Sequence, residues 1–378
     1  MADVRKSRLF TREDMDRIPE LQRLSHEERK AMEAVSWVFP FRVNSHVIQE
    51  LIDWSAAPDD PIYRLVFPQP GMLSPHQLSR MLELVRADAP EGELREAARD
   101  IQLQLNAFPA GQRTLNVPRL DGRPLPGVQH KYRETVLFFP SAGQTCHSYC
   151  TYCFRWSQFS QPDDFRFEAH ETDSLVRYLQ RHPEVQSLLI TGGDPLVMTT
   201  ELLAETVRPL LAPALEHLRS IRFGTKSLSY WPHRFVSDPD ADELLGLFRE
   251  IREAGKHVAL MAHVSHPREL EPSITREAIR RILGTGTVIR TQSPLIRGVN
   301  DEADTWADLW REQTRLGMVP YYMFVARDTG ARHHFQVPLA DVLAIYNGAT
   351  RQVSGLARTA RGPVMSSTPG KVLVLSLI

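Results

Sequence analysis

The stretch Val136-Leu-Phe-Phe-Pro140 is a short apolar run, and Cys146-His-Ser-Tyr-Cys150-Thr-Tyr-Cys153 follows soon after it. The chain has no other cysteine. Thiolates are preferred ligands of iron–sulfur clusters, and three of them can hold three irons of a 4Fe–4S cube. The fourth iron would then stay open to bind and activate a small molecule. The alternative interpretation is a zinc site in which His147 supplies the ligand that three cysteines leave missing.

Further apolar runs follow the first, and amphipathic stretches separate them. Buried strands that alternate with helices predict βα units and a parallel sheet. Because the runs are too few for a closed barrel, we expect an α/β fold with an open partial (β/α)6 barrel and a site at the carboxyl ends of its strands. The runs are Val136–Pro140, Ser187–Thr191, Ser220–Gly224, His257–Ala262, Thr287–Gln292 and Val319–Val325.

The first part of the chain is predicted to be helical. Ser25 with Glu28 forms a capping box, and Ser74-Pro75 with Gln77 is typical of a second helix start. The proline-rich stretch Pro109–Pro126 predicts an extended connector. We therefore expect an N-terminal helical region over residues 1–115, the barrel over 116–330 and a short C-terminal segment over 331–378.

Composition excludes some classes of function. The chain of 378 residues carries 45 Lys and Arg against 46 Asp and Glu, a net charge of -1 that argues against a general nucleic-acid binder. No apolar run is long enough for a membrane helix, and the first residues lack the apolar core of a signal peptide. Clustered thiolates suit a reducing compartment, so we expect a cytoplasmic protein without a membrane partner.

Thr191-Gly-Gly-Asp-Pro195 stands at the end of the second predicted strand. Two glycines let a backbone approach a ligand closely, and the aspartate can accept hydrogen bonds from an ammonium or a ribose. Taken alone, the segment is equally compatible with a tight turn.

The spacing Cys-x3-Cys-x2-Cys after the first barrel strand resembles the radical SAM superfamily. Within it, Gly192-Gly-Asp-Pro195, Gly298-Val-Asn-Asp301 and Pro369-Gly-Lys371 resemble the lysine 2,3-aminomutase family. The resemblance implies that S-adenosylmethionine (SAM) chelates the open iron and is cleaved reductively to a 5′-deoxyadenosyl radical. It also implies pyridoxal 5′-phosphate (PLP) as a cofactor and an external electron donor of the flavodoxin or ferredoxin type.

The same resemblance assigns roles to residues of this chain. Cys146, Cys150 and Cys153 would bind the cluster, Lys371 would form the Schiff base with PLP, and Arg155 would bind the substrate α-carboxylate. The remaining cofactor-binding residues would be Lys131, Tyr132, Arg133, Gly192, Gly193, Asp194, His263 and Gln292.

The chain departs from the family where the substrate side chain would bind. The resemblance implies two aspartates that hold the ammonium of lysine, but Arg327 stands at the first position and Ser366-Ser-Thr368 at the second. A cation there would repel an ammonium and favour a glutamate- or aspartate-like substrate. Alternatively, a shift of one residue lets Asp328 take the role. The residues leave both interpretations open.

The preferred hypothesis is a PLP-dependent radical 2,3-aminomutase, an isomerase that moves the α-amino group of a small amino acid to its β-carbon. One alternative keeps both cofactors but ends in elimination. Another is a PLP-independent radical SAM enzyme in which Lys371 is a surface lysine. A noncatalytic iron–sulfur protein is the last alternative, and a homo-oligomer is compatible with all of them.

Overall fold

The computed structural model describes residues 8–106, 114–160, 166–367 and 370–376. Its centre is a nine-stranded sheet with the order β13-β12-β11-β10-β9-β8-β7-β6-β5. The strands from β6 to β12 run parallel, while β5 and β13 pair antiparallel at the two edges. The bounds are β5 Val128–Tyr132, β6 Thr135–Phe138, β7 Ser187–Ile190, β8 Ser220–Thr225, β9 His257–His263, β10 Val288–Leu295, β11 Val319–Val325, β12 Arg361–Ser366 and β13 Lys371–Leu373.

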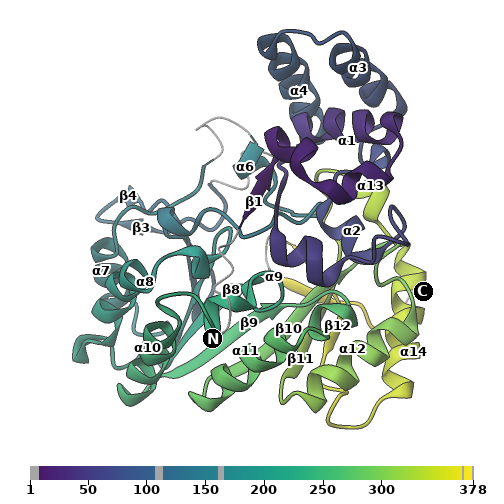
Figure 1. Ribbon diagram of the computed structural model, residues 1–378. Helices are drawn as coiled ribbons and strands as arrows, with labels where there is room; N and C mark the ends of the chain where they lie inside the picture. The colour runs from purple at the N-terminus through teal and green to yellow at the C-terminus, as the bar shows by residue number, and fades with distance from the viewer. Residues whose placement is uncertain (1–7, 107–113, 161–165, 368–369, 377–378) are drawn as a thin grey trace.

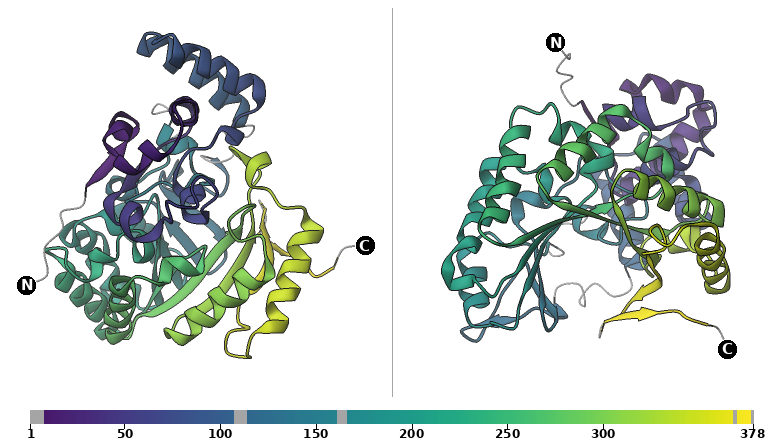
Figure 2. Two further views of the ribbon diagram at one scale, coloured as in Figure 1. Left: turned by 45° about the vertical axis from the view of Figure 1, so that its right-hand side comes forward. Right: turned by 90° about the horizontal axis from the view of Figure 1, so that it is seen from below.

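The predicted partial barrel is confirmed, and the six predicted strands correspond to β6–β11. The sheet is curled (Figures 1 and 2) and is longer than predicted, because β12 adds a parallel strand after β11. The curl brings the edge strands toward each other: the Lys131 ammonium of β5 donates a hydrogen bond to the carbonyl of Ser367, just after β12.

The two faces of the sheet follow from alternation along each strand. In β8, Ile221 and Phe223 are buried while Arg222 is only half-buried, and β10 repeats the pattern around Arg290. Successive side chains of a strand point to opposite faces, so these arginines lie on the face opposite the apolar core. On the core side Phe223 packs against Phe248 of α10 (Ala241–Glu253), with ring centroids 5.5 Å apart. The arginine-bearing face is therefore the inner face of the half-barrel.

Helices cover the outer face (Figure 2). The amphipathic stretches predicted between the strands form them, and a further helix, α14, precedes β12. These helices are α7 Asp173–Gln180, α8 Thr200–Val207, α10, α11 Ser273–Gly284, α12 Ala303–Arg315 and α14 Leu339–Gln352. Two short helices, α9 Ser227–Tyr230 and α13 Arg332–Phe335, instead face the N-terminal region.

The N-terminal helices form a second body of structure packed on the barrel (Figure 1). The predicted capping box at Ser25 and the predicted helix start at Ser74 are both confirmed, with Ser25 capping α1 and Ser74 capping α3. The apolar cluster of these helices also includes Trp156, Tyr230 and Phe335 from the barrel side, so the two parts share a core. The bounds are α1 His26–Val38, α2 Pro61–Val66, α3 Pro75–Arg86 and α4 Glu91–Leu105, with α6 Ser157–Ser160 near the cysteines.

Two small antiparallel strand pairs complete the fold. Strand β1 (Leu9–Thr11) pairs with β2 (Arg42–Asn44), and β3 (Arg119–Leu120) pairs with β4 (Arg123–Pro124). The stretch predicted as an extended connector thus contains a short hairpin, and its beginning lies outside the described residues.

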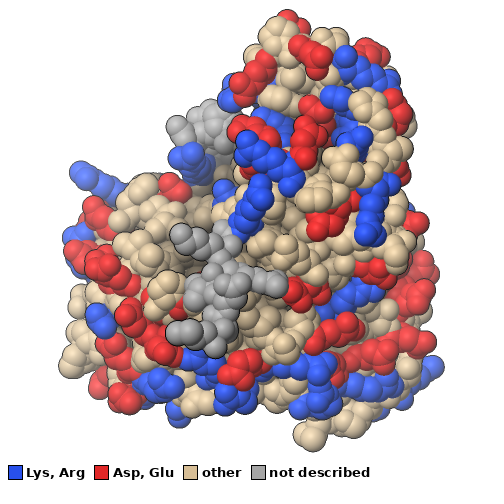
Figure 3. All heavy atoms as spheres, in the orientation of Figure 1, with Lys and Arg blue, Asp and Glu red and all other residues tan. Residues whose placement is uncertain are grey.

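The surface carries mixed charge. On the face shown in Figure 3, acidic and basic side chains are interspersed, as the net charge of -1 leads one to expect. Among the described residues, none of the helices is both long and apolar enough to cross a bilayer.

Candidate functional site

The cysteine loop lies between β6 and α6, where the carboxyl end of β6 and the N-terminal region meet. Backbone hydrogen bonds hold it from the N-terminal side: Tyr149 N donates to Arg42 O at 2.8 Å, and Thr151 N donates to Leu65 O at 2.9 Å. The Asn44 side chain donates to Ser148 Oγ at 3.1 Å. The N-terminal region therefore shapes the loop that carries the three thiols.

The three thiols influence one another electrostatically. Burial raises the pKa of Cys153 to about 12, with Cys150 raising it further, while Arg155 acts in the opposite direction. Burial also raises the pKa of Cys150, and Lys226 opposes that shift. The loop thus places three free thiols near each other and near two cations, which suits a cluster bound by thiolates.

Within the described part of the chain, no three or more Cys, His, Asp or Glu side chains already converge as a chelating group. Cluster binding therefore requires the cysteine side chains to turn toward a common centre. All three are free and partly exposed, so none is committed to another bond. The donor chemistry fits an iron–sulfur cluster better than zinc, since the side chain of His147 stacks on Trp231 instead of facing a thiol set.

The glycine pair after β7 packs directly against the residues before Cys146. A Cβ on Gly193 would lie 2.3 Å from Thr145 O, and one on Gly192 would lie 2.4 Å from Gln144 Nε2. Asp194 N donates to the same Thr145 carbonyl at 2.7 Å. The predicted close approach is thus made to the cysteine loop, and contact with a ligand stays a prediction.

Asp194 is buried, and its carboxylate is fully engaged within the protein. Thr225 Oγ1 donates to it at 2.8 Å, and the backbone N–H groups of Lys226 and Ser227 donate at 2.8 and 3.0 Å. The carboxylate therefore fastens the loop after β7 to the start of α9. The prediction that Asp194 also accepts from a ligand is untested, and in this structure its acceptor positions serve the fold.

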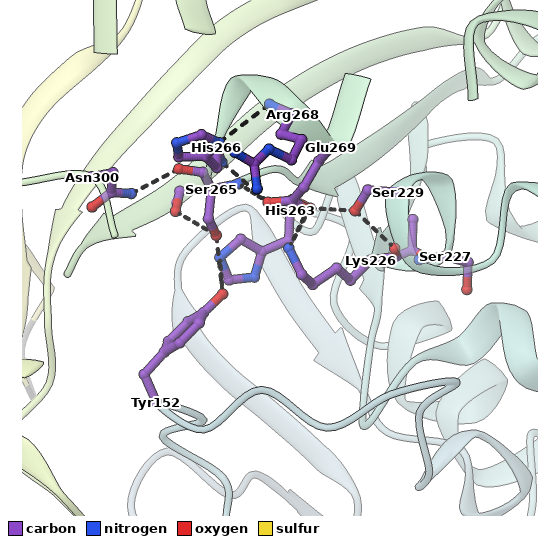
Figure 4. A network of polar contacts seen from close by, with 12 residues as sticks. Tyr152, Lys226, Ser227, Ser229, His263, Ser265, His266, Arg268, Glu269 and Asn300 are labelled. Atoms are coloured by element: carbon purple, nitrogen blue, oxygen red, sulfur yellow. Dashed lines mark hydrogen bonds and ion pairs between the residues drawn. The ribbon is translucent and has the colours of Figure 1, made fainter. Parts of the chain in front are cut away.

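A polar network links the cysteine loop to the ends of β8, β9 and β10 (Figure 4). Tyr152 Oη, between two of the cysteines, lies 3.3 Å from His263 Nε2 and 3.1 Å from Ser265 Oγ. Glu269 accepts from Ser265 N at 2.7 Å and from the Lys226 ammonium at 2.6 Å. Burial lowers the pKa of His263 well below its usual range, so its imidazole is neutral at pH 7.

One row of side chains crosses the inner face from this network to Lys371. Sheet register places His263 beside Gln292, and Gln292 beside Tyr322. The Lys371 Nζ atom lies 3.6 Å from the centroid of the Tyr322 ring and 5.1 Å from that of Phe324. Residues predicted from separate motifs therefore occupy neighbouring strands in one row.

Lys371 lies on an edge strand and is exposed as a residue, yet its amino group is held against aromatic rings. Burial of that group lowers its pKa to about 8, and the nearby cations Arg222, Arg361, Lys131 and Arg327 lower it further. A lysine nucleophile needs such a depressed pKa. Pro369 of the Pro-Gly-Lys segment lies outside the described residues.

Three further residues predicted to bind a cofactor, Lys131, Tyr132 and Arg133, lie in different surroundings. Lys131 lies near this group through its contact with Ser367 O, and burial lowers its pKa. Tyr132 is half-buried beside it, with the Lys131 ammonium 5.7 Å from its ring centroid. Arg133 is exposed in the turn between β5 and β6. The structure thus groups Lys131 and Tyr132 with Lys371 and leaves Arg133 at the surface.

Arg155 is a buried cation, only 8% exposed. Its Nη2 atom donates to the side-chain oxygens of Gln144 and Gln158 at 2.9 and 2.5 Å, and its Nε atom is buried without a partner. Burial lowers its pKa to about 10. A buried guanidinium with a free donor is suited to bind a carboxylate.

Arg327 and Asp328 are both exposed but have different partners. Arg327 Nη2 donates to Ser366 Oγ at 2.8 Å, so the two positions predicted to face the substrate side chain lie next to each other. Asp328 is 66% exposed and forms an ion pair with Arg332 one helical turn away.

Sequence reasoning missed several residues of the site. The pair of Lys226 and Glu269 is almost completely buried, with exposures of 10% and 0%. Lys226 directly follows β8, so its position at the carboxyl end of a parallel strand was a usable signal. The contribution of Arg42, Asn44 and Leu65 had no such signal, because only the tertiary fold brings them to the cysteine loop.

The sequence matches no protein-family model. It is 31% identical over 355 residues to an Aquifex aeolicus protein provisionally named L-lysine 2,3-aminomutase, spanning 94% of this chain and 82% of that one. It is 25% identical to L-lysine 2,3-aminomutase of Acetoanaerobium sticklandii, over 84% of this chain and 73% of that one. A radical SAM methyltransferase from Sphaerobacter thermophilus superposes with a TM-score of 0.45 at 16% identity, over 78% of this chain and 94% of that chain.

The similarity to the Aquifex protein spans nearly the whole chain, from the N-terminal helices through the barrel. It agrees with the motifs, which lie on the cysteine loop, the glycine turn after β7 and the ends of later strands. A 4Fe–4S cluster and SAM are the cofactors that such membership implies. The chain belongs to the lysine 2,3-aminomutase family of the radical SAM superfamily.

Proposed function

We propose that this protein is a PLP-dependent radical SAM aminomutase that moves the α-amino group of an amino acid to the β-carbon. The observation that supports it most is the row from the cysteine loop through His263, Gln292 and Tyr322 to Lys371. The row would place a cluster-bound ligand and a lysine-bound cofactor on the same inner face.

Cys146, Cys150 and Cys153 would hold the cluster, and Lys371 would hold PLP. When bound, the cluster with SAM would supply a carbon-centred radical, and PLP would supply delocalisation for the migrating nitrogen. The chain itself contributes orientation and exclusion of water, which lower the entropic part of the barrier.

Lys371 is suited to its role by its lowered pKa, because a neutral amine is the form that attacks an aldehyde. Arg155 would fix the substrate through its α-carboxylate, using the Nε donor that has no internal partner. Tyr322 and Phe324 would shield the lysine end of the site from water.

The test has two independent parts. First, incubation with PLP and reduction with borohydride should fix a pyridoxyl group on Lys371, located by peptide mass spectrometry and lost in Lys371→Ala. Second, anaerobic protein with cluster, SAM and reductant is offered lysine, arginine, glutamate and aspartate, and β-amino acid products are sought by chromatography. A pyridoxyl group found elsewhere, or elimination products alone, would contradict the proposal.

A further inference from the structure

Six basic side chains gather on the inner face of the half-barrel and at its open edge. They come from separate strands or from the segments just after them, so the gathering is a product of the fold and not of a charged stretch of sequence. The six are Lys131, Arg222, Arg290, Arg327, Arg361 and Lys371.

Within the described parts of the chain, none of these six side chains is ion-paired with a carboxylate. Three of them lie against aromatic rings. Lys371 lies over the Tyr322 ring. Arg290 Cζ is 5.2 Å from the ring centroid of Tyr321, and Arg327 Cζ is 4.4 Å from that of Phe154. Elsewhere on the protein, arginines are commonly paired, as in the contacts of Arg234 with Asp240 and of Arg208 with Glu250. The inner face therefore differs from the rest of the described chain, because its basic side chains have no carboxylate partners.

The six cations act on one another. Arg222, Arg361, Lys131 and Arg327 all depress the pKa of Lys371, and burial lowers the pKa of Arg222, whose Nε atom is buried without a partner. Gathering like charges in a partly desolvated place costs free energy unless opposite charge is supplied. A ligand that brings several negative charges would supply it.

The cofactor phosphate and one α-carboxylate would neutralise only part of this charge, since the phosphate is a dianion and Arg155 already stands ready for the α-carboxylate. Arg327 lies beside the cysteine loop, because its guanidinium stacks on Phe154, the residue next to Arg155. Two guanidinium groups thus border the same short segment, and each retains N–H donors that could bind a carboxylate.

We propose that the substrate is a dicarboxylic α-amino acid, whose side-chain carboxylate is bound by Arg327 with Ser366 Oγ while Arg155 binds the α-carboxylate. This inference rests on the proposed function and names its substrate class. Arg327 and Asp328 are both exposed as residues, but the hydrogen bond to Ser366 directs the Arg327 guanidinium toward β12. Asp328, the residue that could instead receive an ammonium, is already paired with Arg332.

The test is equilibrium binding to the PLP-loaded protein in the absence of reductant, followed by the absorbance of the cofactor and by calorimetry. Glutamate or aspartate should bind at least about tenfold more tightly than lysine, a modest preference for one desolvated charge pair. Arg327→Asp should weaken the acidic ligand at least about tenfold and reverse the preference. Arg327→Lys, which keeps the charge, should restore it in part.

A matched control is Arg311→Asp, which makes the same charge change on the exposed side of α12 and should leave the preference unaltered. Tighter binding of lysine to the wild-type protein, or an unchanged preference in Arg327→Asp, would overturn the proposal. A preference for lysine that disappears in Asp328→Asn would overturn it as well and assign the position to Asp328. Failure to fix a pyridoxyl group on Lys371 would instead refute the proposed function.

Discussion

The pKa of Lys371, and with it the proposed role of this residue, depends on the surroundings of its Nζ atom. The residue lies on an edge strand, where a lysine would ordinarily be solvated and charged. Its amino group is instead partly desolvated and lies near four other cations, and both features favour the neutral form. The sequence could identify this lysine only by resemblance, because the groups that bury its amine and the cations that depress its pKa come from distant segments.

The lowered pKa of Lys371 gives a pH dependence with a definite sign. The value of about 8, against an ordinary 10.5, means that the neutral amine becomes the major form above about pH 8. The rate of borohydride-trapped PLP attachment at Lys371 should therefore rise as the pH passes through 8 and level off above it. Peptide mass spectrometry measures that rate, and a rise that continues to a midpoint near 10.5 would contradict the assigned environment.

At the same scale, Arg327 shows what the sequence left undecided. Two interpretations were open, one in which Arg327 faces the substrate and one in which Asp328 does. Arg327 contacts Ser366 and Asp328 pairs with Arg332, so the first interpretation is the one that we propose, and it stays a prediction. Side-chain direction at the end of a strand depends on the next turn of backbone, which no local pattern specifies.

At the scale of elements, the glycine turn after β7 and the cysteine loop form one packed unit. Gly192 and Gly193 press against Gln144 and Thr145, and Asp194 ties the turn to α9. The turn thus supports the thiol-bearing loop by packing against the two residues that precede Cys146.

This packing predicts that Gly193→Ala is disruptive. The new Cβ would meet backbone atoms of Thr145 at 2.3 to 2.6 Å, which cannot move without displacing the cysteine loop. Overpacking of this kind costs about 1–3 kcal/mol of unfolding free energy, and the iron content after reconstitution should fall. Denaturant unfolding and iron analysis measure both effects.

The control for that variant is Gly246→Ala in α10, where an added Cβ meets nothing within 4 Å. Alanine in place of a helical glycine should raise the unfolding free energy by about 0.5–1 kcal/mol and leave the iron content unchanged. Equal iron loss in both variants would mean that the turn does not position the loop.

The elements also mark the limit of sequence reasoning about the fold. Strands β6–β11 and their helices were predictable, because each strand is an apolar run bounded by an amphipathic stretch. Strand β12 was not, since Arg361-Gly-Pro-Val-Met-Ser366 has no such run and joins the sheet through its pairing with β11. The edge strand β13 is short and exposed, so it carries little pattern at all.

At the scale of the whole molecule, the N-terminal region and the barrel are joined at a buried charge. Asp60 is fully buried, accepts hydrogen bonds from Ile62 N and Tyr63 N at the start of α2, and pairs with Arg268 after β9. This contact spans the two parts of the structure close to the polar network of Figure 4.

Asp60→Ala should therefore destabilise the whole protein. Loss of the helix cap alone costs about 0.5–2 kcal/mol, and leaving Arg268 without its partner adds to that. The matched control is the adjacent Asp59→Ala, which removes an exposed ion pair with Arg64 and should cost less than about 1 kcal/mol. Urea unfolding separates the two, and equal losses would show that the buried contact does not join the two parts.

The proposed activity requires an iron that the three cysteines would leave open to SAM, beside a lysine that would hold PLP. Electron paramagnetic resonance of the anaerobically reconstituted, reduced protein, recorded with and without SAM, tests the first half of that claim directly. We predict a reduced-cluster signal whose line shape changes when SAM is added and which is lost in Cys150→Ser. A protein that binds no iron, or a signal that SAM leaves unchanged, would contradict the account.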